Sequence, residues 1–534
     1  MTTHAQQLCS DYNVSFAQTF RYQYVVSPSA LELPGFTFTA VGQHWVGVGE
    51  ALRCKTLTDS TGVAFGLCLG IAVDHDGKTP EEVFSADFDS ASANALQRFE
   101  QYLQCLAGRY AIISHLHGKT YFHCDPVGMI GAVYAPETGR IASSTFLCID
   151  RPAVWHPLYD RDEIEAGEGA YGLNHTSDAH VFRINASHRM VLDTLQTERF
   201  WPRKEAAFAT DEAQYGAIYD EMIAATRKIM ARMIMLGETS LPLSGGNDSR
   251  LLMAFAGDST LRDITQVFSH INTYANRRDA HVAGILCAAK DRPFEVHDRK
   301  KVSVPRYVRR LAERRYKIGS GTMAVVPKEI ENGLFLNVRE NAIVMRGHQT
   351  NIMRGQYLVT ADPEEWRKPR WQIRMMRLVG NGKFNGEVAT RFLPAFQRYY
   401  DDLPENALAR SADFIFYETL VPAALGTLFP GQDHAFYLSP FNSRRLVQLS
   451  MQPDTAYRMR NAPTTDVLLR ADPVLAALPF AYELPADLQE TQEALKTRHR
   501  RVRDGLRRYA DIFGECAPEE EAMVLPLSES AEDE

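Results

Sequence analysis

Between residues 239 and 298 the chain alternates short apolar segments with longer segments of mixed character, and this alternation constrains the fold most. The segments 239–246, 264–271 and 293–298 have the composition of strands, whereas 248–257 and 279–291 have that of helices. Parallel strands need a crossover connection, which is usually a helix. The order strand, helix, strand, helix, strand therefore predicts an α/β, doubly wound parallel sheet.

The first 200 or so residues have a different character. Short segments such as 36–49, 62–73 and 108–124 are rich in Val, Ile, Phe and Tyr and are separated by Gly, Asp and Pro. This pattern is typical of strands joined by turns. A more helical pattern occupies Glu81–Leu106. We therefore predict a layered α+β domain that precedes the doubly wound one.

The sequence changes character near Trp201–Thr210, where a long helical pattern begins. We expect the apolar stripe of this helix, which is rich in methionine, to pack in the core. We predict a first domain at 1–205 and a second at 206–515. An acidic tail at 516–534 is expected to be disordered, and the basic stretch 496–508 is expected to be either a solvated face or a cover for a phosphate-rich site.

Composition excludes several classes of protein. Hydrophobic residues make up 45% and charged residues 23% of the 534 residues, which is ordinary globular usage and excludes a disordered chain. The formal net charge of −8 gives no global attraction to nucleic acid or to an anionic membrane. The eight cysteines are scattered, without metal-binding spacing, and no signal peptide or membrane span is visible. We expect a soluble cytoplasmic protein.

The turn after the first predicted strand carries the clearest chemical signal. It reads Ser244-Gly245-Gly246-Asn247-Asp248-Ser249, and a helix is predicted to start directly after it. The glycines allow close approach of a ligand, and the serine hydroxyls and free helix N–H groups can bind phosphate oxygens. Asp248 would repel a bare phosphate, so its presence implies a bridging Mg²⁺.

This turn resembles the pyrophosphate-binding loop of the PP-loop ATP pyrophosphatases, and the best match among them is the asparagine synthetase family. The resemblance implies that ATP and Mg²⁺ are bound and that a substrate is adenylated with release of pyrophosphate. It places Asp248 and Asn351 at the metal. It also places these residues around the nucleotide: Leu243, Ser244, Gly245, Gly246, Asp248, Ser249, Val267, Arg346 and Gly347.

In the N-terminal half, Leu106–Ala111 and Cys124–Gly128 resemble the family's glutamine amidotransferase domain, which implies the αββα sandwich of N-terminal-nucleophile (Ntn) hydrolases. The family's nucleophile is a cysteine directly after the initiator methionine, and Thr2 stands there in this chain. We therefore expect an inactive glutaminase. β-Lactam synthetase and the lasso-peptide cyclases are family members that have lost the same activity.

The segment Val344–Tyr357 aligns with a second conserved loop of the family, on which His348 falls at a catalytic position and Asn351 at a metal-binding aspartate. Glu418 falls where β-lactam synthetase has the glutamate of its catalytic dyad. The resemblance therefore makes His348 and Glu418 a candidate pair for general-base catalysis. The alternative is that Glu418 forms an ion pair with an arginine in the core.

The family's late catalytic lysine has no counterpart, because Asp466 occupies its place. Arg458, Arg460 or Arg470 could supply the cation instead, although arginine does not give up a proton as lysine does. Arg346 and Arg354 add positive charge near the expected triphosphate.

These observations favour an ATP-dependent ligase that adenylates a small-molecule or peptide carboxylate and joins it to an amine, without glutamine. Natural-product or modified-peptide biosynthesis is the context that the resemblance suggests, with a monomer or homodimer as the active form. A catalytically degenerate scaffold for a partner enzyme and a PP-loop enzyme that adenylates a tRNA base are the alternatives.

Overall fold

The computed structural model describes residues 2–483 except 167–169, 324, 356, 359, 367 and 369–385. The predicted acidic tail at 516–534 and the basic stretch 496–508 lie outside the described residues. The described chain is a mixed α/β protein, in which two antiparallel sheets precede one parallel sheet.

The N-terminal half contains two six-stranded antiparallel sheets. The first has the order β10-β8-β9-β1-β3-β2 and the second the order β12-β11-β7-β6-β5-β4. Their strands are β1 (Tyr24–Ser27), β2 (Phe36–Val41), β3 (His44–Gly49), β4 (Cys54–Thr58), β5 (Ala64–Val73), β6 (Ala107–Leu116), β7 (Lys119–Cys124), β8 (Val133–Ala135), β9 (Arg140–Ala142), β10 (Phe182–Arg183), β11 (His188–Val191) and β12 (Gln196–Arg199).

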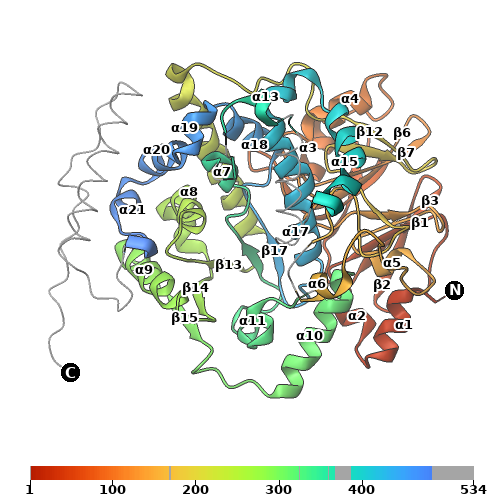
Figure 1. Ribbon diagram of the computed structural model, residues 1–534. Coiled ribbons are helices and arrows are strands. Elements are labelled where there is room, and N and C mark those ends of the chain that lie inside the picture. The colour runs from red at the N-terminus through yellow and green to blue at the C-terminus, as the bar shows by residue number, and fades with distance from the viewer. Residues whose placement is uncertain are drawn as a thin grey trace.

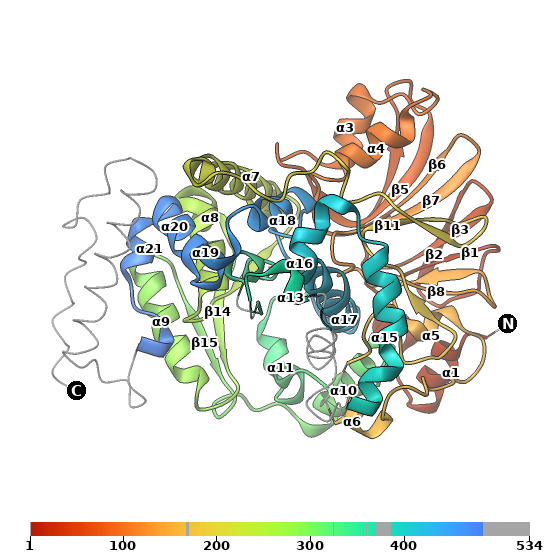
Figure 2. The same ribbon diagram turned by 45° about the horizontal axis from the view of Figure 1, so that its top comes forward.

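Aromatic and aliphatic side chains hold the two sheets face to face. The ring of Tyr24 in β1 stacks on that of Phe122 in β7, with the ring centroids 6.0 Å apart. Helices cover the outer faces: Phe84 and Phe99 pack onto the second sheet, and Phe16 and Phe146 onto the first (Figure 2). These helices are α1 (His4–Asp11), α2 (Phe16–Thr19), α3 (Pro80–Asp87), α4 (Ala95–Tyr102) and α5 (Thr145–Cys148).

A long helix, α7 (Tyr215–Met235), connects the two halves after α6 (Arg161–Glu165) and the short η1 (Glu212–Gln214). Its methionine-rich stripe is buried, as the sequence predicts: Met222, Met230 and Met233 have no exposed surface. The stripe joins the core cluster that runs from the antiparallel sheets into the parallel one. The helix therefore packs against both halves of the molecule.

The parallel sheet has five strands in the order β15-β14-β13-β16-β17 (Figure 1). The predicted alternation is confirmed, because helices α8 and α9 lie between the first three strands in sequence. The elements are β13 (Thr239–Pro242), α8 (Asn247–Asp263), β14 (Gln266–Ile271), α9 (Asn276–Ala289), β15 (Glu295–Asp298), β16 (Ile343–Met345) and β17 (Phe436–Leu438).

The remaining described elements are helical and pack around this sheet. They are α10 (Arg306–Ser320), α11 (Lys328–Glu331), η2 (Leu334–Asn337), α12 (Asn351–Arg354), α13 (Pro363–Trp366), α15 (Gly386–Asp401), η3 (Glu405–Arg410), α16 (Ser411–Ile415), η4 (Phe416–Leu420), α17 (Val421–Leu428), α18 (Arg444–Met451), α19 (Thr455–Met459), α20 (Ala462–Ala471), α21 (Pro473–Ala477) and η5 (Ala481–Glu483). Within the described ranges, no helix has both the length and the apolarity needed to cross a bilayer.

The two halves are joined by buried polar contacts. The side-chain amide of Asn442 donates to the carbonyl oxygen of Gly108 and to the carboxylate of Asp125, at 2.7 and 2.8 Å. The guanidinium of Arg444, which is fully buried, donates to the carbonyl oxygens of Cys124 and Ala186. These bonds satisfy polar groups that would otherwise be buried without partners, so they fix how the halves meet.

Candidate functional site

The turn between β13 and α8 is held in one shape by its own serines. The hydroxyl of Ser249 accepts the N–H of Ser244 at 3.0 Å, and the two serine Oγ atoms lie 3.1 Å apart. Gly245 has no room for a side chain, because a Cβ there would lie 2.5 Å from the Cβ of Ala481. Gly246 is the N-cap of α8, and a Cβ there would meet only the Oγ of Ser244 at 3.5 Å. The turn therefore exposes a helix N-terminus with hydroxyls beside it, as the sequence predicts.

The loop that follows β16 forms the facing wall. A Cβ on Gly347 would lie 2.4 Å from the carbonyl oxygen of Asp248, so this loop touches the start of α8 only because residue 347 is glycine. From the same wall, the hydroxyl of Thr350 donates to the Asp248 carboxylate at 2.9 Å. The guanidinium of Arg354 forms an ion pair with that carboxylate at 3.0 Å.

Two adjoining hollows of about 230 and 170 Å³ open between these walls, and each is smaller than a typical small-molecule pocket of about 300 Å³ or more. They share Pro242, Leu243, Ser244 and Arg346. The larger hollow is lined by Pro242, Leu243, Ser244, Asp248, Ser249, Arg346, Gly347 and His348. Seven of those eight residues are site residues that the sequence predicts. The hollows lie at the carboxyl ends of the parallel strands, where ligands of open α/β sheets bind.

The smaller hollow contains five polar residues that the sequence analysis missed: His270, Asn272, Asn276, Glu329 and Tyr437. It is also lined by Asp279, which the sequence offers either as a residue that orients substrate or as a helix cap. His270 lies at the carboxyl end of β14, and Asn272, Asn276 and Asp279 follow that strand, a position that was a usable signal. Glu329 and Tyr437 come from α11 and β17, and the sequence contains no local feature that points to them.

Val267 contributes to the site through its strand and not through its side chain. It is buried in β14, paired in parallel with Leu241 of β13, and it does not line either hollow. Its assignment as a nucleotide-binding residue concerns the β14 backbone and stays a prediction.

Burial raises the pKa of Asp248 above its usual value, although the Arg354 guanidinium and the Thr350 hydroxyl act in the opposite direction. One carboxylate beside a phosphate site suits Mg²⁺, which typically uses one or two carboxylates and substrate phosphates. Asn351 lies in α12 and lines neither hollow. Among the residues described, no group of three or more His, Cys, Asp or Glu side chains could hold a metal ion. The fit to Mg²⁺ therefore depends on Asp248 and on phosphates of a ligand.

His348 lines the larger hollow, but its environment suits a neutral imidazole. Burial, with a smaller effect of Arg346, lowers its pKa to about 3. Its ring packs edge-on against that of Phe429, and its Nδ1 is buried without a partner among the described atoms. An imidazole with this pKa is a weak base near neutral pH. It can still exchange a hydrogen bond with a ligand.

The structure does not pair His348 with Glu418. The Glu418 carboxylate is fully buried and accepts two hydrogen bonds from the guanidinium of Arg199, at 2.7 and 3.1 Å. The amide of Asn185 donates a third at 3.2 Å. Burial acts to raise the pKa of Glu418, but Arg199 and the other partners of the carboxylate outweigh it, so the pKa is lowered. This corrects the predicted dyad: a buried carboxylate needs a cation, and the one that reaches it comes from β12, far away in sequence.

The candidates for the missing lysine also lie away from the hollows. Arg458 is buried and forms an ion pair with Asp413, and Arg470 bonds to Asp220 across α20 and α7. Arg460 is exposed and lies against the ring of Tyr457. Asp466 is buried and accepts a hydrogen bond from the Tyr457 hydroxyl. The cations of the site are Arg346 and Arg354 instead.

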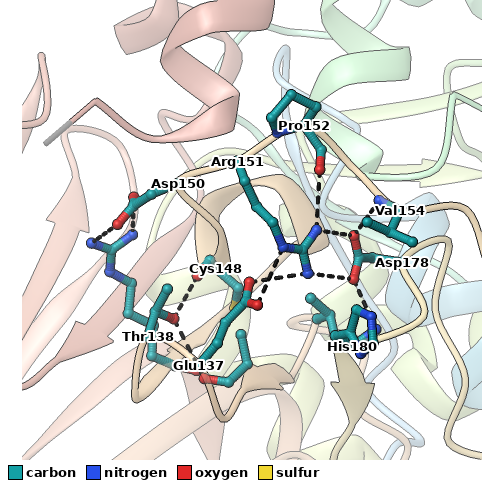
Figure 3. Close-up of polar contacts among 12 residues, drawn as sticks. Glu137, Thr138, Cys148, Asp150, Arg151, Pro152, Val154, Asp178 and His180 are labelled. Atoms are coloured by element: carbon teal, nitrogen blue, oxygen red, sulfur yellow. Dashed lines mark hydrogen bonds and ion pairs between the residues drawn. The ribbon is translucent and has the colours of Figure 1, made fainter.

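The N-terminal half has a second polar cluster, which is saturated. Asp178 accepts hydrogen bonds from the guanidinium of Arg151 and from the backbone N–H groups of Val154 and His180, and Arg151 also pairs with Glu137 (Figure 3). Every strong acceptor position of Asp178 is thereby used, so this cluster stabilises loops. Thr2, the residue at the nucleophile position of the resemblance, is exposed and precedes α1.

The fold and the site define a Rossmann-like α/β domain with a ligand hollow at its sheet edge, attached to two antiparallel sheets. The chain matches no protein-family model and no curated protein.

Proposed function

We propose that this chain is an ATP-dependent, AMP-forming ligase of the asparagine synthetase type. The observation that carries the proposal is the larger hollow. Leu243, Ser244, Asp248 and Ser249 from the β13–α8 turn meet Arg346, Gly347 and His348 from the β16 loop around it. These two segments are about 100 residues apart in sequence, and the proposal requires both of them at one nucleotide.

The turn would bind the phosphates of ATP. Free N–H groups at the start of α8 and the hydroxyls of Ser244 and Ser249 supply donors, and the helix dipole favours negative charge there. Arg346 and Arg354 supply the cations that stabilise the phosphates. Asp248 and the phosphates would hold Mg²⁺, which neutralises charge and orients the phosphates.

In the proposed reaction, a substrate carboxylate attacks the α-phosphorus of ATP, which gives an acyl-adenylate and pyrophosphate. An amine then attacks the acyl carbon and displaces AMP. With a pKa of about 3, His348 would orient a substrate by a hydrogen bond and would not take the proton from the amine. In this proposal, one orienting imidazole takes the place of a general-base dyad.

The N-terminal half fits the same proposal as an Ntn-type αββα sandwich without glutaminase activity. Its two face-to-face sheets and their helical covers have the required layers. Thr2, and not a cysteine, stands directly after Met1. The nitrogen would therefore come from an amine substrate and not from glutamine.

A scaffold protein that lacks catalysis is the second candidate, and the ion pair between Arg354 and Asp248 favours it. This pair gives the metal-binding carboxylate a protein partner at 3.0 Å. Asn351 offers no charge to compensate. For the ligase to work, Mg²⁺ and the nucleotide would have to displace Arg354 from the carboxylate of Asp248.

Product analysis by mass spectrometry tests the proposal. The purified chain is given Mg²⁺-ATP and an extract of small molecules and peptides from its source cells. We expect AMP and pyrophosphate from the wild type and from Asp263→Ala, an exposed carboxylate on the same helix, but not from Asp248→Ala. Formation of ADP would contradict the PP-loop mechanism, and binding of ATP without any turnover would favour the scaffold.

A further inference from the structure

A strongly basic segment of the described chain lies outside the site. Residues 299–317 contain nine lysines and arginines and one acidic residue, in a chain whose net charge is −8. Six of the nine are exposed, and we call them the basic face: Arg299, Lys300, Lys301, Arg306, Arg310 and Arg314. The rest of the chain is therefore more acidic than the net charge suggests.

Packing of α10 explains why these side chains face outward. Ala312 and Tyr316 pack with Val326, Ile330 and Phe335 on the inner side of the helix. Arg306, Arg310 and Arg314 are spaced four residues apart, so they form one ridge on the outer side with a step of about 6 Å. Tyr307, beside this ridge, is 73% exposed.

Most of the charge on this face is not neutralised by the protein. Within the described chain, the side chains of Arg299, Lys300, Lys301, Arg306 and Arg310 form no ion pair or hydrogen bond. That of Arg314 donates only to the backbone oxygen of Tyr12, at 3.3 Å. The inward-facing Arg315, in contrast, is paired with Asp433. Like charges along one helix ridge are unfavourable unless an anionic partner offsets them.

The basic face begins next to the candidate site. Its first three residues follow the carboxyl end of β15, at the sheet edge where the hollows open. The N–H of Arg299 donates to the carbonyl oxygen of Ile271 at 3.2 Å. The next residue, Asn272, lines the smaller hollow. A ligand that contacts this face can therefore extend from it into the site.

We propose that the basic face binds an acidic segment of a peptide substrate, whose reacting carboxylate enters the hollow. The substrate role rests on the proposed ligase function, whereas binding of the acidic segment does not. Carboxylates match guanidinium groups in geometry, and the Tyr307 ring offers apolar contact. The short extent of the face favours a peptide over RNA, because a longer polyanion would reach the acidic remainder of the surface.

Fluorescence anisotropy with a labelled hexaglutamate peptide tests the binding. We expect wild-type protein to bind it and not hexaglutamine, and to bind it more weakly as salt rises from about 50 to about 300 mM. Arg306→Glu combined with Arg310→Glu should weaken binding about tenfold or more. Lys55→Glu combined with Lys119→Glu, two exposed lysines of the antiparallel sheets, is the matched control and should change it little.

Three results would overturn the proposal: no binding of hexaglutamate, equal loss in the control variant, or tighter binding of a 20-nucleotide single-stranded RNA that the same arginine variant abolishes. ATP binding, measured in parallel by calorimetry, separates this proposal from the proposed function. The arginine variant should bind ATP like the wild type. If the protein binds hexaglutamate but no ATP, the acidic-segment site stands and the proposed ligase function is wrong.

Discussion

At the scale of single residues, Gly347 decides whether the two walls of the site can meet. The carbonyl group of Asp248 occupies the space that a side chain at residue 347 would need. Both clashing atoms belong to the backbone, which cannot rotate away as a side chain can. The shape of the larger hollow therefore depends on the lack of a side chain at residue 347.

We expect Gly347→Ala to push the β16 loop away from α8, with a loss of about 1–3 kcal/mol in unfolding free energy. ATP affinity should fall about tenfold or more, because Arg346 and His348 move with the loop. Gly246→Ala is the control for stability, since a Cβ there meets only Ser244 Oγ at 3.5 Å. Denaturation and calorimetry measure both effects, and an unchanged Gly347→Ala protein would contradict the clash.

Glu418 shows where prediction from sequence stops. The residues of the β13–α8 turn could be predicted because they are adjacent in sequence, and a strand–turn–helix positions them locally. The partner of Glu418 is Arg199, more than 200 residues earlier in the chain. A buried carboxylate needs a cation beside it, but only the tertiary fold shows which cation that is.

We expect Glu418→Gln to lower the free energy of unfolding and not to act on catalysis directly. The change would leave Arg199 with a buried charge that lacks its main partner, which costs about 3–5 kcal/mol. Denaturant unfolding measures this loss, and Glu405→Gln, an exposed glutamate nearby in sequence, serves as the control. A Glu418→Gln protein with full stability but no adenylation would restore the catalytic interpretation.

At the scale of elements, α8 is anchored at its start by the last part of the described chain. Arg250 is fully buried and donates to the carbonyl oxygens of Leu475, Leu478 and Pro479. The N–H of Ala481 donates to the carbonyl oxygen of Gly245 at 3.1 Å. The turn between β13 and α8 is thus held in place by residues more than 200 positions away in sequence.

Arg250→Lys should weaken this anchor. One ammonium group cannot satisfy three carbonyl groups in the arginine fork, and each buried acceptor left without a donor costs about 1–3 kcal/mol. We expect lower unfolding free energy and faster hydrogen exchange at the start of α8. Arg262→Lys, exposed on the same helix, should show neither effect. Equal exchange rates in both variants would contradict the anchoring role.

The elements themselves were largely predictable. The alternation after residue 239, the β-rich N-terminal half and the buried methionine stripe all appear as expected, because local patterns of apolar residues determine them. The lining contributed by α11 and β17 was not predictable. Those residues reach the site through packing of elements that are distant in sequence.

At the scale of the whole molecule, partly buried histidines make the fold sensitive to acid. Burial lowers the pKa of His270 and His348 to about 3 and that of His75 and His175 to about 4. In the unfolded chain a histidine has a pKa near 6.5. Below that pH the unfolded state binds protons that the folded state does not. The free energy of unfolding therefore decreases as the pH is lowered.

We expect the unfolding free energy to be highest above about pH 6.5 and to decrease by on the order of 1 kcal/mol per such histidine between pH 6.5 and 5.5. Urea unfolding at several pH values measures this slope. A variant with His75→Gln and His175→Gln should have a shallower slope than the wild type, whereas His180→Gln, whose ring is exposed, should not. A flat profile for the wild type would contradict the argument.

The buried hydrogen bonds between the two halves also limit how this chain can recombine. They join Asn442 and Arg444 to Gly108, Asp125, Cys124 and Ala186. A recombination event that exchanged the N-terminal half for another would separate these donors from their acceptors in the core. We therefore expect the antiparallel sheets and the parallel sheet to tolerate exchange only as one unit.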